Sequence, residues 1–150
     1  MATIENEPIR RRALPRVQEI VFDCSAPALL ARFWGELLEV IWTAPRPDWA
    51  MVDATPLLMA FQRVPEAKSS PKNRLHIDVQ VESLERFHRR AVSLGAATVR
   101  TEARDSDVDG YIVLRDPEEN EFCLVADSGD WMSWVHAEFE RTANEVERAD

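Results

Sequence analysis

The segment NRLHIDVQVESLERFHRRAVSLGA, residues 73–96, contains a clear pattern of secondary structure. Its first part, Arg74 to Val81, alternates apolar and polar residues, which is typical of a strand with one buried face. Ser83 then stands where a helix N-cap is expected, and Gly95 suits the residue just after the helix. The apolar residues predicted to face inward from this helix are Leu84, Phe87, Ala91, Val92 and Leu94. The segment therefore predicts a strand followed by an amphipathic helix.

A similar strand and helix occur earlier in the chain, in FDCSAPALLARFWGELLEV, residues 22–40. Residues 17–23 have the composition of a strand, Ser25 is the expected N-cap, and Pro27 suits the first turn of a helix that ends near Leu38. Trp34 lies on the apolar face of this helix, so we expect it in the core. Each pair is followed by three short apolar runs, which predicts the order β-α-β-β-β in both halves. These runs are Val40–Trp42, Trp49–Val52 and Leu57–Arg63 in the first half, and Ala97–Thr101, Tyr111–Leu114 and Glu121–Ala126 in the second.

The repeated order divides the chain into three parts. Residues 1–15 form an N-terminal arm, residues 16–126 form one domain with modules at 16–64 and 73–126, and residues 127–150 form a C-terminal amphipathic helix. The apolar stripe of that last helix consists of Trp131, Trp134, Val135 and Phe139. Such a stripe requires cover, either from its own domain or from a partner subunit, and the sequence leaves both alternatives open.

Composition excludes several classes of function. The net charge of -9 repels phosphate backbones, so we expect no binding to nucleic acid. No apolar run approaches the length of a membrane span, and the two cysteines, Cys24 and Cys123, lack the spacing of a structural zinc site. Reduced cysteines favour a cytoplasmic location. The absence of a nucleophile motif or a phosphate-binding glycine loop argues against covalent hydrolysis and nucleotide use.

The two quoted segments, together with LRDPEENEFCLV at residues 114–125, resemble glyoxalase-like proteins of the vicinal-oxygen-chelate (glyoxalase/bleomycin-resistance/dioxygenase) superfamily. This resemblance implies an α+β fold in which two βαβββ modules form a curved, cup-like sheet of eight strands. It also implies a small-molecule site inside the cup, often in a homodimer. Glu119 departs from the family pattern, which has a left-handed glycine in this turn, so we expect the loop to differ in shape.

Strand alternation predicts which side chains line the concave face. In residues 75–81 it separates His76, Asp78 and Gln80 from the apolar residues that pack on helices. The tryptophans after the first helix, together with Phe61, are candidates for aromatic walls. The complete predicted ligand-binding set is Glu19, Asp23, Trp42, Trp49, Gln62, His76, Asp78, Gln80 and Cys123.

Many members of the superfamily bind a divalent metal, and the resemblance places its ligands here at Glu19, Gln62, His76 and Cys123. The first three residue types can coordinate Zn, Ni, Mn or Fe. A carboxylate is usual at the position of Cys123, and a thiolate there shifts the preference toward zinc or leaves the site unused. The alternative is a metal-free site in which His76 forms hydrogen bonds and Glu19 pairs with Arg74 or Arg115.

Three functions remain open at this point. The first is a metal-independent protein that binds a small organic molecule such as a drug or secondary metabolite. The alternative is a metal-dependent lyase, isomerase or dioxygenase with Glu19 and His76 as catalytic residues. The third is a module that only dimerises. Fold alone does not decide whether the chain is an enzyme, and metal content separates the first two functions.

Overall fold

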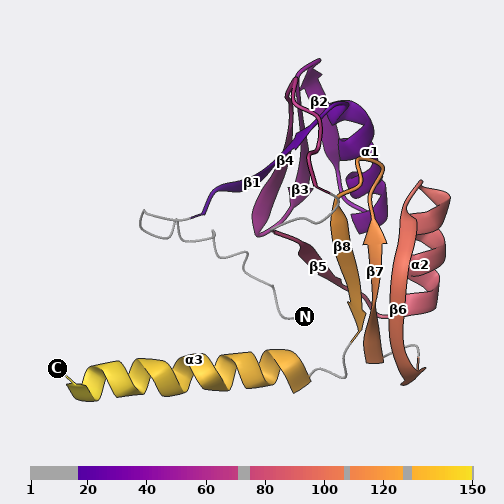
Figure 1. The fold of residues 1–150 in the computed structure, drawn as a ribbon. Coiled ribbons are helices and arrows are strands. Elements are labelled where there is room, and N and C mark those ends of the chain that lie inside the picture. The colour runs from indigo at the N-terminus through magenta and orange to yellow at the C-terminus, as the bar shows by residue number, and fades with distance from the viewer. Residues whose placement is uncertain (1–16, 71–74, 107–108, 127–129, 150) are drawn as a thin grey trace, which may run out of the picture.

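The computed structural model describes residues 17–70, 75–106, 109–126 and 130–149. The predicted arm at residues 1–15 and the residue Arg74 lie outside this part of the chain. The first module contains β1 (Glu19–Cys24), α1 (Pro27–Leu38), β2 (Trp42–Arg46), β3 (Trp49–Ala54) and β4 (Leu57–Arg63). The second contains β5 (Ile77–Gln80), α2 (Leu84–Ser93), β6 (Ala97–Ser106), β7 (Asp109–Arg115) and β8 (Glu121–Ala126), and α3 (Asp130–Ala149) follows it (Figure 1).

The two modules have the same strand topology. Their sheets have the orders β1-β4-β3-β2 and β5-β8-β7-β6. In each sheet the first strand runs parallel to the last, and the remaining pairs are antiparallel. The predicted α+β fold of two βαβββ modules with a C-terminal helix is thus confirmed. The strands are hydrogen-bonded as two four-stranded sheets, and their arrangement is consistent with a cup.

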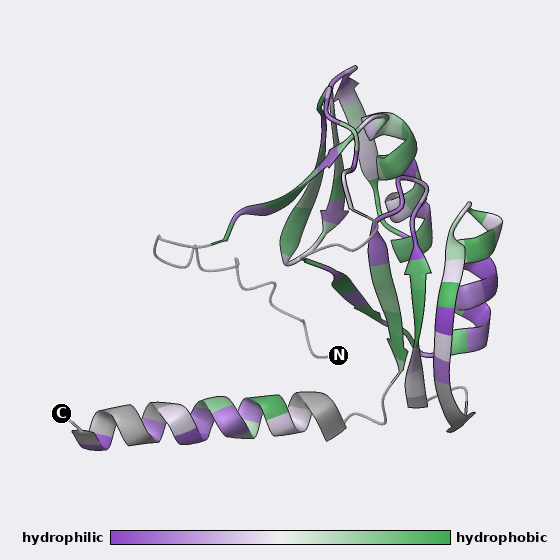
Figure 2. Ribbon diagram, in the orientation of Figure 1, coloured by the Kyte–Doolittle hydropathy of each residue, from purple (hydrophilic) through white to green (hydrophobic). Residues whose placement is uncertain are grey.

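Helix α1 forms part of the core of both modules. Leu30, Phe33, Trp34 and Leu37 are buried on its apolar face, which Figure 2 shows in green. Trp34 is 1% exposed, and its ring centroid lies 4.9 Å from that of Phe122 in β8. The prediction that Trp34 belongs to the core is therefore confirmed.

Both ends of α1 are capped by residues of the second module. At the N-terminal end, the N-cap is Ala26, so the prediction of a Ser25 cap was wrong. The carboxylate of Glu118 accepts hydrogen bonds from the Ala26 N–H at 2.8 Å and from the Ser25 hydroxyl at 2.6 Å. A carboxylate is favourable there because the first N–H groups of a helix carry partial positive charge.

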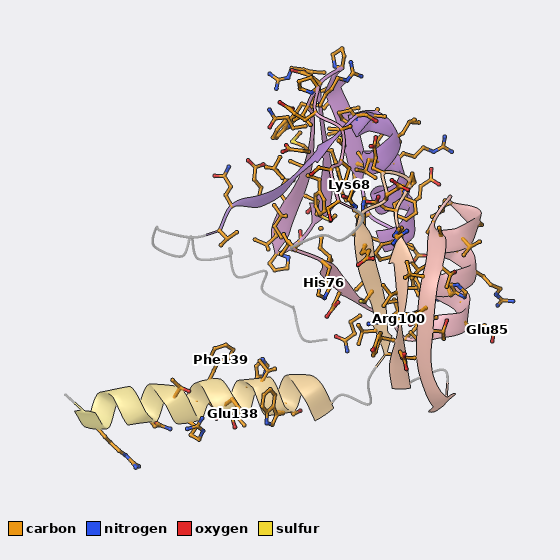
Figure 3. All side chains as sticks on the ribbon, viewed as in Figure 1. Lys68, His76, Glu85, Arg100, Glu138 and Phe139 are labelled. Atoms are coloured by element: carbon orange, nitrogen blue, oxygen red, sulfur yellow. The ribbon has the colours of Figure 1, made fainter. Side chains whose placement is uncertain are left out.

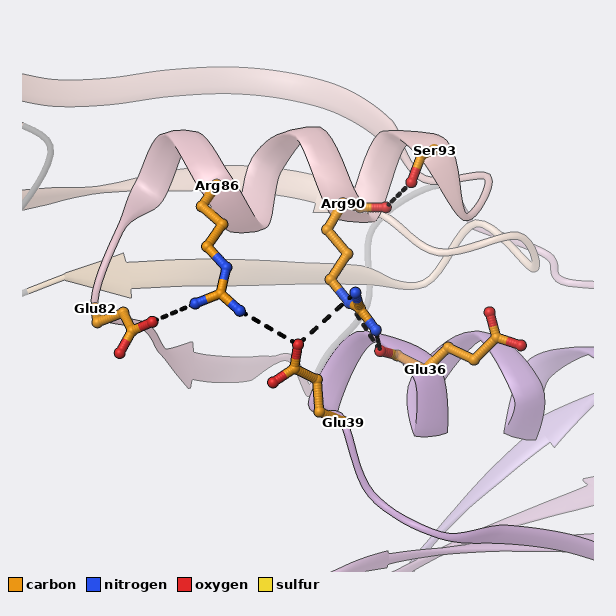
Figure 4. A network of polar contacts seen from close by, with 6 residues as sticks. All are labelled: Glu36, Glu39, Glu82, Arg86, Arg90 and Ser93. Atoms are coloured by element: carbon orange, nitrogen blue, oxygen red, sulfur yellow. Dashed lines mark hydrogen bonds and ion pairs between the residues drawn. The ribbon is translucent and has the colours of Figure 1, made fainter.

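At the C-terminal end of α1, the guanidinium of Arg90 in α2 donates from Nε to the carbonyl oxygen of Glu36 at 2.9 Å (Figure 4). Arg86 and Arg90 also lie 3.5 and 3.7 Å from the carboxylate of Glu39, and Arg86 pairs with Glu82. Positive charge at a helix C-terminus is favourable for the same electrostatic reason. The polar network thus joins the two helices.

Three predictions of local structure in the second module had different outcomes. The N-cap role of Ser83 is confirmed, because its side chain accepts a hydrogen bond from the Arg86 N–H. The inward orientation of Val92 was wrong, since this residue is 47% exposed. Glu119 has a φ of 64°, so it adopts the left-handed conformation that the resemblance assigns to a glycine at this position, and the expected difference in shape is not seen at this residue.

Helix α3 extends away from the two sheets (Figure 1). Trp134 is 54% exposed and Phe139 is 72% exposed. Figure 3 shows the side chains of Phe139 and Glu138 leaving α3 in different directions. Its apolar stripe is therefore not covered by the rest of the same chain at these two residues. None of the helices in the described ranges has the length and apolar character needed to cross a membrane.

Candidate functional site

The register of the second sheet brings three potential ligand residues together. Asp78 of β5 stands directly opposite Cys123 of β8. His76 precedes Asp78 by two residues, so its side chain lies on the same face of the sheet. One donor atom from each residue lies within 4.8 Å of the others, and His76 Nε2 is 3.5 Å from Asp78 Oδ1. Among the described residues, no other set of three histidine, cysteine or carboxylate side chains brings its ligand atoms this close together.

The side chains of this group are open to solvent. The relative exposure is 51% for His76 and 60% for Asp78, while Cys123 is half-buried. Cys123 stands opposite Val113 of β7, and Val113 stands opposite Arg100 of β6, so these residues form one row across the sheet. Figure 3 labels His76 and Arg100, which come from opposite edges of this sheet. The side chains of His76 and Asp78 are therefore accessible to a ligand.

The predicted residues of the first module lie elsewhere. Glu19 begins β1 and stands opposite Leu58, whereas Gln62 stands opposite Asp23 and Trp49. Glu19 and Asp23 are four positions apart on one strand, which corresponds to about 13 Å. The structure thus brings Gln62, Asp23 and Trp49 together at one end of the sheet. Glu19 is not part of the group of His76, Asp78 and Cys123.

A cavity of about 600 Å³ lies where the C-terminal end of α1, the β3–β4 turn and β5 meet. Its walls are mostly apolar, and the acidic residues that line it are Asp53 and Asp78. Asp53 accepts a hydrogen bond from the Thr55 hydroxyl at 2.6 Å. The lining residues are Trp34, Leu38, Val40, Ile41, Asp53, Ala54, Thr55, Met59, Ile77, Asp78 and Val79. The volume is typical of sites for small organic ligands.

Asp78 is the one predicted ligand-binding residue that lines this cavity. The other lining residues were missed because they come from a helix end, a turn and three strands that meet only after folding. Leu38 and Met59 have the sequence pattern of ordinary core residues. Ile41 is 81% exposed, but the exposure of an apolar residue cannot be recognised from sequence, so this residue gave no signal of the cavity.

The aromatic residues have different environments. Phe61 is fully buried and stacks on Phe22 with ring centroids 5.3 Å apart, so its assignment as a pocket wall was wrong. Trp42 is 36% exposed and packs against α1 at Gly35, where an added Cβ would lie 2.5 Å from Trp42 Cδ1. Trp49 is half-buried opposite Gln62.

Two buried groups have raised pKa values and belong to the structural framework. Burial, with a further contribution from Glu118, raises the pKa of Cys24 to about 11. Burial also raises the pKa of Asp116, although its carboxylate accepts hydrogen bonds from Trp34, Glu118 and Asn120. Arg115, considered as a partner for Glu19, lies 3.5 Å from Glu121.

Solved structures similar to this chain have the same fold. A glyoxalase-related enzyme from Fulvimarina pelagi has a TM-score of 0.60 at 15% identity, over 76% of this chain and 89% of that chain. A glyoxalase/bleomycin resistance protein/dioxygenase family enzyme from Burkholderia phytofirmans PsJN has a TM-score of 0.61 at 12% identity, over 73% and 97%. At these identities the likeness shows the fold alone.

A third similar structure is a mutant of the fosfomycin resistance protein FosX from Listeria monocytogenes, complexed with Mn(II) and 1S,2S-dihydroxypropylphosphonic acid. Its TM-score is 0.61 at 12% identity, over 78% of this chain and 94% of that chain. No curated protein matches the sequence. The model of the glyoxalase-like domain matches residues 19–125, which span both modules. The chain therefore belongs to the glyoxalase-like domain family.

Proposed function

We propose that this protein binds a small, largely apolar organic molecule in the cavity between its two modules. The observation that carries the proposal is the position of Asp78, which lines the cavity and also belongs to the polar group with His76 and Cys123. A ligand in the cavity would bury its apolar part against residues such as Leu38 and Met59. Its polar end would reach Asp78 and His76.

The cavity itself can be tested with N-phenyl-1-naphthylamine, a neutral probe whose fluorescence rises in apolar sites. Ala54 lines the cavity, so Ala54→Trp should fill it and weaken probe binding at least about tenfold. Ala44 is exposed on β2 and does not line the cavity, so Ala44→Trp is the matched control and should bind the probe as the unmodified chain does. Equal binding by both variants would refute the proposal.

A metal-dependent lyase, isomerase or dioxygenase is the second candidate, favoured by the close approach of the donor atoms of His76, Asp78 and Cys123. A divalent ion bound there would polarise a substrate oxygen. The chain's own residues would hold the ion on the open face of the second sheet, next to the cavity. Elemental analysis of protein purified without chelator separates the two candidates, because the first requires no metal.

His76→Ala distinguishes a site residue from a structural one. Since the His76 side chain is 51% exposed, its removal should leave the melting temperature nearly unchanged. The same change should weaken ligand binding or turnover. A loss of several kcal/mol of stability would instead show that His76 supports the fold.

A further inference from the structure

We propose that the metal site of this protein is built within the second module alone, from His76, Asp78 and Cys123, and that it is adapted to zinc. This inference deepens the metal-dependent candidate above. It differs from the set implied by the family resemblance, because it includes Asp78 and omits Glu19 and Gln62.

The geometry of the second sheet supports this set. Asp78 and Cys123 are direct neighbours on the paired strands β5 and β8, and His76 Nε2 already lies 3.5 Å from Asp78 Oδ1. Ligands of one zinc ion lie about 3 to 4 Å apart, because zinc bonds are about 2.0 to 2.3 Å long. The three donor atoms already lie within 4.8 Å of one another, so side-chain rotation is enough to bring them to the spacing of zinc ligands. His76 and Asp78 are exposed, which allows this rotation.

The corresponding positions of the first module cannot form such a group. The modules have the same topology, so Glu19 corresponds to His76 and Val21 to Asp78. Ala60 stands opposite Val21 as Cys123 stands opposite Asp78. Valine and alanine have no ligand atoms. Val21 and Ala60 therefore offer Glu19 no second or third metal ligand.

The chemistry of the donors indicates the metal. Thiolate and imidazole ligands suit zinc, whereas manganese is better matched by oxygen ligands. Three protein ligands also leave a fourth position open, as in catalytic zinc sites. Asp78 also lines the cavity, so the metal site and the cavity would share this residue.

Zinc titration by calorimetry tests the ligand set. We expect one zinc ion per chain and at least about tenfold weaker binding in His76→Ala, Asp78→Asn and Cys123→Ser. Glu19→Gln should bind zinc within about twofold of the unmodified chain. If Glu19→Gln weakens binding as much as Asp78→Asn, or if the unmodified chain binds no zinc, the inference is wrong.

Cobalt provides a spectroscopic readout of the thiolate. The Co²⁺-loaded chain should show a sulfur-to-cobalt charge-transfer band that is lost in Cys123→Ser and kept in Cys24→Ser. Most sites bind zinc more tightly than manganese, so selectivity must be compared between variants. Cys123→Glu should lower the ratio of zinc to manganese affinity at least about tenfold. A band that survives Cys123→Ser, or an unchanged ratio, would overturn the inference.

These results are independent of the cavity proposal. Probe binding by N-phenyl-1-naphthylamine reports on the cavity, and zinc titration reports on the ligand set. Both proposals are supported if Asp78→Asn loses zinc binding and Ala54→Trp weakens binding of the probe. Normal zinc binding in Asp78→Asn contradicts only the metal site.

Discussion

The indole Nε1 of Trp34 donates a hydrogen bond to Asp116 Oδ2 at 3.1 Å, and this contact joins the first module to the turn before the last strand of the second. Both residues are buried, with exposures of 1% and 3%. The same carboxylate organises its own turn by accepting from Glu118 and Asn120. Asp116 therefore fixes the turn and the helix of the other module at once.

Trp34→Phe should lower the free energy of unfolding by about 1 to 3 kcal/mol, because it removes a buried hydrogen bond to a carboxylate while keeping an aromatic ring. Urea unfolding measures the change. Trp42→Phe is the matched control, since Trp42 is partly exposed and no side-chain hydrogen bond to it is seen within the described residues. An equal loss in both variants would mean that ring size, not the contact with Asp116, is responsible.

Glu118→Ala should lower the free energy of unfolding by about 1 kcal/mol, because the first turn of α1 loses its acceptor. Thermal or urea unfolding again provides the measurement. Glu119→Ala removes the neighbouring carboxylate and keeps the cap, so its effect should be smaller. The capping role would be excluded if Glu119→Ala were the more damaging change.

The raised pKa of Asp116 predicts an unusual pH dependence. Burial raises this pKa above 3.8, so between 3.8 and the raised value the folded chain binds more protons than the unfolded chain. The contribution of Asp116 to stability therefore rises as the pH falls through this window and is lost as the pH rises through it. Relative to Asp116→Asn, the unmodified chain should gain stability as the pH is lowered from neutral toward 3.8. Parallel stability curves for the two proteins would contradict this.

The two cysteines should differ in reactivity. Cys24 is 5% exposed with a pKa of about 11, so at neutral pH it is a buried thiol and should resist alkylation in the folded protein. Cys123 is half-buried on the open face of the sheet and should react first. Mass spectrometry after brief maleimide treatment should show one label, which Cys123→Ser removes. Rapid labelling of Cys24 would contradict the burial of its thiol.

We expect the chain to form a homodimer that covers the apolar stripe of α3. Light scattering at micromolar concentration should give twice the chain mass. Phe139 is 72% exposed, so Phe139→Ser should shift the protein toward the monomer, whereas Glu140→Ser on the same helix should not. A monomer mass that does not change with concentration would exclude this assembly.

Local patterns in the sequence were sufficient to predict the order of elements and the two-module repeat. Periodicity is a local property, so the bounds of β4 and β8 and the cap of α2 by Ser83 could be predicted. Strand alternation also predicted that His76 and Asp78 lie on one face, because side chains two residues apart in a strand point the same way.

Tertiary packing, in contrast, determines which faces of the strands and helices meet. The pairing of β5 with β8 places Cys123 beside Asp78, and the register of β1 with β4 leaves Glu19 away from Gln62. The cap of α1 by Glu118 joins residues that are 92 positions apart at the Ala26 N–H. The cavity likewise requires a helix end, a turn and an edge strand to converge. Such contacts depend on how whole elements pack, and no local pattern in the sequence encodes them.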